Sequence, residues 1–346
     1  MSVNGGLRAT VIGAAGLIGG ELLRILSQHP RIGSIAAVSK SNAGKAAADV
    51  HKALLHLPAI QLVNISIDEI AEASDVVFCA MAHGESQRVM PGLVKGRALC
   101  IVDMGADFRL RDPEVFRKHY EAHVCPDLIQ QFVYGLPEAH RAAIRSGRCV
   151  ANPGCLATAA QLLLLPMAAS GDLADWSSVF AVTGSSGAGV APRPSTHHPF
   201  RSDNMFAYKM LAHQHEPEID QTLSDVAGRH STVRLLAHSG PFVRGIHATA
   251  CMRGGSFGDK DLAAMYRDFY KTCPFVTVLP RPPEVAEVSA TNFAHVHVVQ
   301  KGDQAEIVLT LDNLVKGGAG QAVQNMNLVL GFPETEGLKN PGAFPC

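Results

Sequence analysis

The most reactive side chain that the sequence singles out is a cysteine that follows a tight turn. Cys155 comes directly after Asn152-Pro-Gly154, and a helical pattern runs from about Ala157 to Ala169. The N-terminus of a helix offers unpaired amides and the positive end of a dipole, and both favour a thiolate and a developing oxyanion. The context of Cys155 therefore predicts a nucleophile, with a buried structural cysteine as the alternative.

The other seven cysteines lack this context. They are scattered through the chain, several of them in apolar runs, and they form no Cys-x-x-Cys pair. Cysteine in such runs is usually a small buried hydrophobic residue, and no disulfide framework is expected in a chain of this size. We expect this buried role for Cys79, Cys100, Cys125, Cys149, Cys251, Cys273 and Cys346.

A nucleophilic cysteine needs a base, and a pair of histidines is the best candidate. His213 and His215 stand two residues apart, so on an extended segment both rings would face the same way. A metal site or a satisfied polar pair are the alternatives, but no third ligand has a recognisable spacing, so no metal is predicted. A second pair, His197-His198, precedes a proline and is expected in an exposed turn.

A glycine-rich turn near the start of the chain predicts a nucleotide site. Its glycines are spaced G-x-x-G-x-x-G between a strand-like run and a helical one. This arrangement gives a tight turn, close backbone approach to a pyrophosphate and a helix N-terminus directed at negative charge. The residues expected to contact the cofactor are Gly13, Ala14, Ala15, Gly16, Leu17, Ile18 and Gly19.

The end of the second expected strand indicates which nucleotide binds. NAD-binding chains typically place a carboxylate there for the ribose 2′-hydroxyl. This chain has Ser39, Lys40 and Ser41 instead, with Lys45 beyond and no carboxylate among residues 39–45. These residues favour NADP, whose 2′-phosphate they would attract; a solvated basic loop is the alternative.

Two fold classes follow one another along the chain. In the first half, short β-rich runs alternate with helical ones, which predicts a parallel α/β sheet of the Rossmann type. From about residue 180, strands follow one another with few helices between them, which predicts a largely antiparallel sheet in an α+β domain. Expected strands are 7–12, 32–39, 75–82, 98–104, 177–183, 232–238, 245–252, 275–279, 294–299 and 306–312, and expected helices are 20–28, 86–93 and 320–330.

Length and composition agree with two folded domains. The chain has 346 residues, of which 47% are hydrophobic and 18% charged, so disorder of the whole chain is excluded. Lys and Arg total 30 against 31 Asp and Glu, a net charge of −1, so charge gives no reason to expect nucleic acid or a membrane surface as a partner. No signal segment or membrane span is expected, and we predict a cytoplasmic protein.

Several motifs in a fixed order make the chain resemble the N-acetyl-γ-glutamyl-phosphate reductases, relatives of aspartate-semialdehyde dehydrogenase. The resemblance covers nearly the whole length. Its motifs are Gly13-Ala-Ala-Gly-Leu-Ile-Gly19, Asp103-Met-Gly-Ala-Asp-Phe-Arg109, Asn152-Pro-Gly-Cys155, Ser186-Gly-Ala-Gly189, His213-Gln-His-Glu-Pro-Glu218, Arg244-Gly-Ile246 and Asp312-Asn-Leu-Val-Lys-Gly-Gly-Ala-Gly-Gln321.

The resemblance implies a reaction and a role for each matching residue. Cys155 would attack an acyl phosphate, and the resulting thioester would take hydride from NADPH to give a semialdehyde. His215 would be the general acid and base, His213 would lie close to substrate, and Arg109 would hold a phosphate or carboxylate in its bidentate fork.

The same motifs imply roles for four further residues. Ser186 and Gly187 match a loop that contacts the cofactor, and Asn313 matches a residue that positions the nicotinamide amide or merely shapes a turn. Arg244 would bind substrate or brace the sheet. We also expect Asn152 and Tyr208 to contact substrate.

Some residues depart from the arginine-pathway pattern. Leu156 stands where those enzymes usually carry Tyr, and Val190 stands where a basic residue is common. The Thr196-His-His-Pro199 loop resembles the lysine-biosynthesis branch, in which the acyl phosphate is attached to a small acidic carrier protein. N-acetylglutamyl phosphate is the main expectation and a carrier-linked substrate the alternative. A non-catalytic NADP sensor and a metal-dependent hydrolase are less favoured classes.

The expected domain boundaries place the nucleotide site and the nucleophile on different domains. We expect residues 1–152 to bind NADP, completed by 313–346, and residues 153–312 to form the catalytic and oligomerisation domain. The antiparallel sheet of the second domain is expected to pair in a homodimer or homotetramer.

Overall fold

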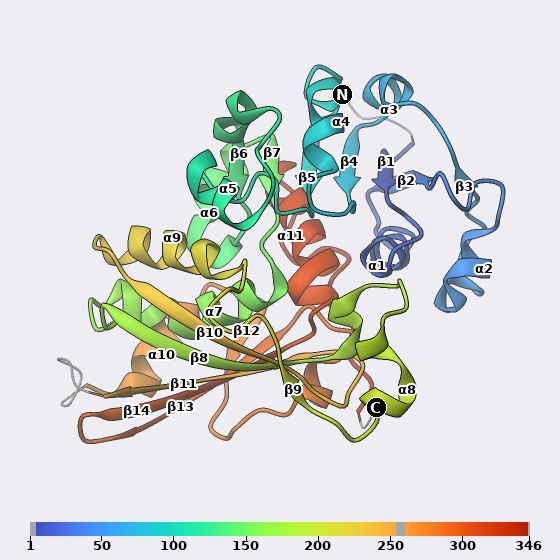
Figure 1. Ribbon diagram of the computed structural model, residues 1–346. Coiled ribbons are helices and arrows are strands. Elements are labelled where there is room, and N and C mark those ends of the chain that lie inside the picture. The colour runs from blue at the N-terminus through green and yellow to red at the C-terminus, as the bar shows by residue number, and fades with distance from the viewer. Residues whose placement is uncertain (1–4, 254–259, 345–346) are drawn as a thin grey trace. The chain divides into compact units, whose positions relative to one another are not determined.

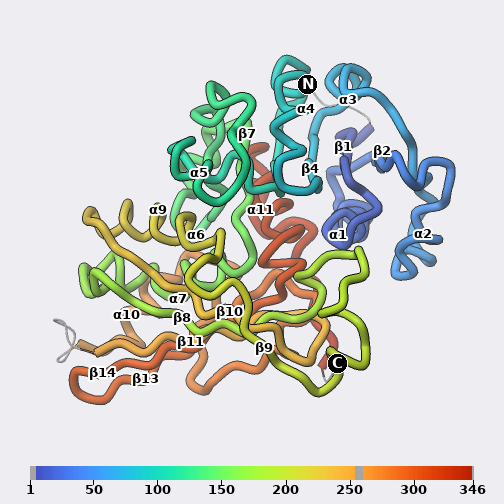
Figure 2. Tube along the Cα trace, viewed as in Figure 1, coloured from blue at the N-terminus to red at the C-terminus, as the bar shows by residue number. Residues whose placement is uncertain are grey.

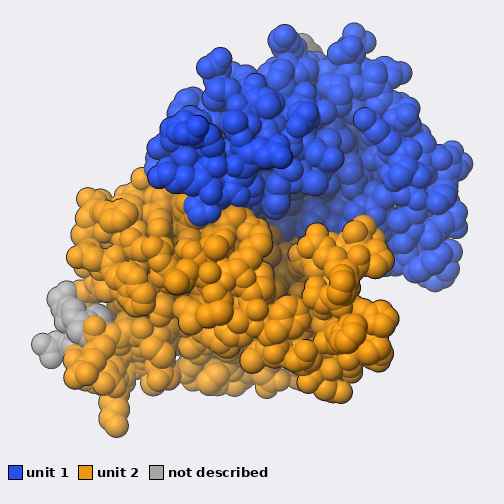
Figure 3. Space-filling view, in the orientation of Figure 1, with its two compact units in different colours: residues 1–153, 318–339 blue, residues 154–317, 340–346 orange. Residues whose placement is uncertain are grey.

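The computed structural model describes residues 5–253 and 260–344. They form two compact units, coloured separately in Figure 3. Unit 1 comprises residues 1–153 and 318–339, and unit 2 comprises residues 154–317 and 340–346. The chain thus leaves unit 1 at Pro153 and re-enters it at Gly318, whereas the sequence placed these boundaries at 152/153 and 312/313.

Unit 1 is built on a seven-stranded parallel sheet in the order β3-β2-β1-β4-β5-β7-β6. Its strands are β1 (Leu7–Ile12), β2 (Ile32–Val38), β3 (Leu62–Val63), β4 (Val76–Cys79), β5 (Cys100–Asp103), β6 (Phe132–Tyr134) and β7 (Cys149–Ala151). Its helices are α1 (Leu17–Leu26), α2 (Ala47–Val50), α3 (Ile67–Ala73), α4 (Ser86–Leu93), α5 (Pro113–His119), α6 (Pro137–Ser146) and α11 (Gly320–Val329).

The sheet grows outward in both directions from the boundary between β1 and β4, which is its topological switch point. In open parallel sheets, ligands bind beyond the carboxyl ends of the strands at such a switch point. Every residue of β4 and β5 is buried, which is typical of parallel strands covered on both faces. Helix α11 comes from the end of the chain and contacts α1, α6 and β5 of this unit (Figures 1 and 2).

Unit 2 contains a second seven-stranded sheet, in the order β12-β13-β14-β11-β8-β10-β9. The strands are β8 (Trp176–Thr183), β9 (Phe206–Ala207), β10 (Thr232–Ser239), β11 (Ile246–Arg253), β12 (Val276–Val278), β13 (Ala294–Lys301) and β14 (Gln304–Leu311). Four of the six pairings are antiparallel, and the two parallel ones are β8 with β10 and β12 with β13. The sheet is therefore mixed but mostly antiparallel, and the predicted fold class is confirmed.

Helices α7 (Cys155–Ala169), α9 (Glu216–Ala227) and α10 (Leu262–Tyr270) pack against one face of this sheet (Figure 1). Alternate strand residues point to the opposite face, where Phe180, Leu236 and Val299 are exposed. A further short helix, α8 (His198–Arg201), precedes β9. Among the described residues, no helix has the length and apolar composition needed to cross a bilayer.

The sequence expectation of few helices in the second unit was wrong for two segments. Helices α9 and α10 were not predicted, and each packs on the sheet. Helix α7 starts at Cys155, two residues earlier than expected, so the cysteine belongs to its first turn.

Candidate active site

Cys155 is the first residue of α7, and glycines on both sides allow the chain to pack closely around it. Gly154 is the N-cap and provides no side chain to cover the helix end. A Cβ added to Gly317 would lie 2.7 Å from the Cys155 Cβ, so only glycine fits there. The thiol is half-buried at the positive end of a 15-residue helix, which is where a thiolate is stabilised.

His215 lies against Gly154, the residue that precedes Cys155. A Cβ added to Gly154 would lie 2.3 Å from His215 Nε2, so the missing side chain makes room for the imidazole. The rings of His213 and His215 pack edge to face with centroids 4.8 Å apart, and the Tyr208 ring lies 5.7 Å from that of His213. Four predicted residues, Tyr208, His213, His215 and Cys155, therefore gather in one part of unit 2.

The two histidines are adjacent for a different reason from the one expected. The spacing in the sequence was interpreted as an extended segment. Instead, residues 214–215 form a turn that leads into α9, with His215 as the N-cap. In this turn the His215 amide donates to His213 Nδ1 at 3.2 Å. A neutral His213 that accepts at Nδ1 must carry its proton on Nε2. Burial, and then the charge of Lys209, lowers the pKa of His213 to about 4, so the ring is neutral near pH 7.

Burial also affects Tyr208. The pKa of its phenol is raised by burial first and by the nearby Cys155 second, so Tyr208 stays protonated and can donate a hydrogen bond.

Glu218 is a site residue that the sequence did not single out. Its carboxylate, 1% exposed, accepts the Gly154 amide at 3.0 Å, and its own carbonyl accepts from the Gln161 side chain of α7 at 2.8 Å. These bonds fix α9 against the turn that leads into Cys155. The signal was present, because Glu218 follows His215 by three residues and so lies one helical turn away.

The glycine-rich loop has the geometry that the sequence predicted for a phosphate site. Gly13 has φ +81°, and a Cβ there would lie 2.2 Å from the Ala80 carbonyl oxygen. A Cβ on Gly19 would lie 2.4 Å from the Gly13 oxygen, so the turn closes only with glycine. Gly16 is the N-cap of α1 and has no side-chain cap, which leaves the helix N-terminus open to an anion.

Two further features of this loop were not predicted. His51 Nε2 lies 2.8 Å from the Ala14 carbonyl oxygen, and a Cβ on Gly20 would meet the His51 ring at 2.5 Å. Ala80, directly after β4, lies beside the start of the loop, because its amide donates to the Ile12 oxygen at 2.8 Å and its oxygen leaves no room for a Cβ on Gly13. His51 is far away in sequence and belongs to no recognisable motif, so only the structure reveals it.

The segment after β2, residues 39–45, carries two lysines and two serines and no Asp or Glu. Ser39 is buried and its amide donates to the Val63 oxygen at 2.9 Å, whereas Lys40 and Ser41 are exposed. Lys45 Nζ donates to Asn42 Oδ1 at 3.1 Å. This arrangement fits a 2′-phosphate better than a free 2′-hydroxyl.

Asn313 and Ser186 contact each other in unit 2. Asn313 Nδ2 donates to Ser186 Oγ at 3.0 Å, and Asn313 Oδ1 accepts the Gly245 amide at 2.7 Å. Ser186 Oγ in turn donates to the Val243 oxygen at 2.7 Å, while the neighbouring Gly187 is exposed. The predicted cofactor loop is thus joined to the turn after β14, and its contact with nicotinamide stays a prediction.

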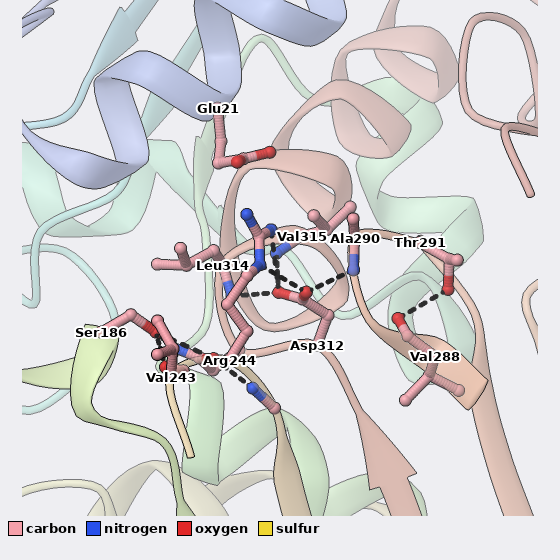
Figure 4. Close-up of polar contacts among 12 residues, drawn as sticks. Glu21, Ser186, Val243, Arg244, Val288, Ala290, Thr291, Asp312, Leu314 and Val315 are labelled. Carbon is pink, nitrogen blue, oxygen red and sulfur yellow. Dashed lines mark hydrogen bonds and ion pairs between the residues drawn. The ribbon is translucent and has the colours of Figure 1, made fainter. Parts of the chain in front are cut away.

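Arg244 forms a bidentate ion pair with Asp312, as Figure 4 shows. The Asp312 carboxylate is fully buried and also accepts the amides of Ala290, Leu314 and Val315. These contacts correspond to the bracing role that the sequence left open for Arg244.

Arg109 and Asn152 are held inside unit 1. The Arg109 guanidinium donates to the main-chain oxygens of Asn152 and Met104, each at 2.8 Å, and Asn152 Nδ2 donates to the Gly318 oxygen at 3.3 Å. Asn325 donates to Asn152 Oδ1 at 3.0 Å. The contacts found for both residues are internal, and their predicted substrate roles remain predictions.

The remaining cysteines and histidines mostly follow expectation. Cys79, Cys100, Cys149 and Cys273 are buried and Cys125 is half-buried, but Cys251 is exposed because it points away from the helices on β11. Cys346 lies outside the described residues. His197 and His198 are exposed, and within residues 5–253 and 260–344 no group of three or more His, Cys, Asp or Glu side chains could hold a metal.

Fold and site together define a semialdehyde dehydrogenase. Residues 8–147 match the NAD binding domain of the semialdehyde dehydrogenases, and residues 155–313 match their dimerisation domain. The chain is similar in structure to aspartate semialdehyde dehydrogenase II of Vibrio cholerae, with a TM-score of 0.72 and 14% identity over 94% of this chain and 98% of that one. This likeness concerns the fold alone.

Relatives in sequence identify the family within the semialdehyde dehydrogenases to which the chain belongs. The chain is 41% identical to an N-acetyl-gamma-glutamyl-phosphate reductase of Nitrosospira multiformis, over 98% of this chain and all of the relative. It is 39% identical to a protein of Pyrobaculum aerophilum named as a LysW-linked L-2-aminoadipate or L-glutamate phosphate reductase, over 96% of this chain and 98% of that protein. The chain belongs to the N-acetyl-γ-glutamyl-phosphate reductase family.

Proposed function

We propose that this protein reduces N-acetyl-γ-glutamyl phosphate to N-acetylglutamate 5-semialdehyde and phosphate with NADPH. The observation that carries the proposal is the placement of Cys155 in the first turn of α7 with the His215 ring against the preceding glycine. A thiol at a helix N-terminus beside an imidazole is suited to acyl transfer. The Nitrosospira multiformis relative carries this activity in its name.

The first step forms a thioester. His215 takes the thiol proton while Cys155 Sγ attacks the acyl carbon, the carbon–oxygen bond to phosphate breaks, and His215 passes the proton to the departing phosphate. The N-terminus of α7 stabilises the tetrahedral oxyanion. Tyr208 and the Nε2–H of His213 are donors available to substrate oxygens.

The second step releases the aldehyde. NADPH, when bound, supplies the hydride that adds to the thioester carbon. The oxyanion then collapses and expels the Cys155 thiolate, which recovers a proton through His215. Arg109, Asn152 and Arg244 complete the proposed substrate residues.

The nucleotide would be held by unit 1. We propose that its pyrophosphate lies over residues 13–19 and its 2′-phosphate beside Ser39, Lys40 and Ser41, because these positions combine close backbone approach with positive charge. Ser186, Gly187 and Asn313 are proposed for the nicotinamide end. In this proposal residues 1–152 with 313–346 form the NADP domain and residues 153–312 the catalytic domain, in a cytoplasmic biosynthetic enzyme.

A carrier-linked substrate is the second candidate. The Pyrobaculum aerophilum relative is nearly as similar as the others, and its name specifies a LysW-linked substrate. The chemistry at Cys155 would be the same, so only the group on the substrate nitrogen differs.

Phosphate-dependent oxidation of the semialdehyde decides between the two. We expect the protein to form NADPH from NADP, phosphate and N-acetylglutamate 5-semialdehyde, measured by absorbance. The carrier-linked semialdehyde is assayed in parallel at equal concentration. Turnover of the carrier-linked compound alone would contradict the acetylated substrate.

We further propose that a second copy of the chain covers the open face of the unit 2 sheet, giving a homodimer or a homotetramer of such dimers. One row of paired residues across this face runs His297, Val308, Thr249, Phe180 and Leu236. The row carries no Asp, Glu, Lys or Arg, and the sheet belongs to the segment that matches a dimerisation domain. An uncharged, partly apolar row with charged residues such as Glu306 and Arg234 in the next row of the same face suits the centre of a self-complementary interface.

A further inference from the structure

Two buried carboxylates in unit 1 have no part in the chemistry proposed above. Asp103 ends β5, Asp107 follows four residues later, and both are fully buried. Ser86 Oγ, at the start of α4, lies 3.1 Å from Asp103 Oδ2 and 2.8 Å from Asp107 Oδ2. One hydroxyl group thus bridges two carboxyl groups.

The number of protons in this bridge decides whether one of the two carboxyl groups is protonated. The Ser86 hydroxyl has one proton and can satisfy one of the two contacts well, so a second proton is needed for the other. Asp107 also accepts the amides of Gly84 at 2.8 Å and Gln87 at 3.0 Å, whereas Asp103 accepts the Gly105 amide alone at 3.1 Å. Asp107 is therefore the better place for a negative charge, and the proton belongs on Asp103.

The electrostatic surroundings agree with this assignment. Burial first and the charge of Asp107 second raise the pKa of Asp103 to about 7, and the Arg109 guanidinium only partly offsets them. Other titratable groups facing the cluster are Cys79 on β4 and Cys125, whose thiol donates to the Gln87 oxygen. The His83 ring accepts the Ala106 amide at 3.1 Å, and the His123 ring lies 2.9 Å from the Asp107 carbonyl oxygen.

The cluster joins the two segments that follow β4 and β5. Gly84, Ser86 and Gln87 belong to the first, which begins at Ala80, and the Ala80 oxygen lies against Gly13 of the glycine-rich loop. The second carries Arg109, which holds the main-chain oxygen of Asn152. A change in the protonation of the cluster would therefore shift both the glycine-rich loop and the end of β7, which leads to Asn152 and Cys155.

We propose that Asp103 is a positioning residue whose carboxyl proton, shared through Ser86 with Asp107, fixes these two segments and keeps the nucleotide crevice in its binding geometry. Above neutral pH the proton is lost, two carboxylates face one hydroxyl, and the segments separate. NADP binding then weakens, and the reductase loses activity on its alkaline side. The effect on turnover rests on the proposed function, but the effect on nucleotide binding does not.

Asp103→Asn is the sharpest variant, because its amide donates to Ser86 Oγ without titrating and its oxygen still accepts from Gly105. We expect NADP affinity of the unaltered protein, measured by calorimetry, to fall at least about fivefold from pH 6.5 to 8.5, the lower range of coupling between linked sites. The Asn variant should match it at pH 6.5 and stay constant. Ser86→Ala and Asp103→Ala should bind more weakly at both pH values.

Asp75→Asn is the matched control, since Asp75 precedes the opposite end of β4 and pairs with Arg8 and Arg97. It should leave the pH dependence of NADP binding unchanged. An Asp103→Asn variant with the wild-type pH dependence would overturn the proposal, and so would wild-type affinity in Ser86→Ala. Because binding is measured without turnover, a wrong substrate assignment would not affect either result.

Discussion

At the scale of single residues, the lowered pKa of His213 should make the free energy of unfolding depend on pH. Its pKa in the folded state, about 4, lies below the ordinary value of 6.5 because the ring is buried next to Lys209. The unfolded chain therefore binds more protons between these values, and stability that is present above pH 6.5 is lost as pH falls toward 4. The full difference corresponds to roughly 3 kcal/mol.

His213→Asn should remove this dependence, because asparagine does not titrate and its oxygen can still accept the His215 amide. We expect its free energy of unfolding, from urea titrations between pH 4 and 7, to vary less than that of the unaltered protein by roughly 3 kcal/mol. The exposed His56→Asn is the control. Equal slopes for the His213 variant and the unaltered protein would show that His213 is not held neutral.

At the scale of elements, two glycines of the glycine-rich turn are expected to serve different purposes, Gly19 in folding and Gly16 in nucleotide binding. Gly19→Ala would place a Cβ 2.4 Å from the Gly13 oxygen, whereas at Gly16 the nearest atom is 3.4 Å away and the backbone conformation is ordinary. We expect Gly19→Ala to cost about 1–3 kcal/mol of stability and to lose NADP binding.

Gly16→Ala should change stability by less than about 0.5 kcal/mol yet weaken NADP binding, because the methyl group would stand where the pyrophosphate approaches. Thermal unfolding and calorimetry measure the two effects separately. Wild-type NADP affinity in Gly16→Ala would place the pyrophosphate elsewhere.

Local patterns predicted the parts of the fold that depend on neighbours in sequence. The strand β1, the turn with its three glycines and the helix α7, to within two residues of its start, could be identified because turn chemistry and apolar runs are local properties. Helix α9 was missed because its sequence is mostly polar, although Pro217 near its start is a typical helix signal. Its burial depends on α7, which is distant in sequence.

The site was predicted in the same uneven way. Residue type and context selected Cys155 and the pair His213 and His215, and the family resemblance selected His215 from that pair. The contact of Glu218 with the Gly154 amide and that of His51 with Ala14 depend on tertiary packing. The exposure of Cys251 likewise depends on which face of the sheet the helices cover.

At the scale of the whole molecule, the open sheet face should control assembly. Phe180 and Leu236 are 37% and 42% exposed on adjacent strands. We expect Phe180→Asp with Leu236→Asp to yield monomers in sedimentation velocity, because two carboxylates per subunit would be buried among the uncharged residues of this row. The control is Leu55→Asp, at an exposed site of unit 1. A double variant of unchanged oligomeric mass would exclude this face.

The central claim is a covalent thioester on Cys155, and intact-protein mass spectrometry tests it most directly. The protein is mixed with N-acetyl-γ-glutamyl phosphate in the absence of NADPH, and the adduct is located by peptide mapping. We predict one acyl group per chain on Cys155, release of one equivalent of phosphate, and loss of the adduct when NADPH is added. Cys155→Ser should form no thioester while binding NADP normally. Full turnover in that variant, or an acyl group on another residue, would contradict the account.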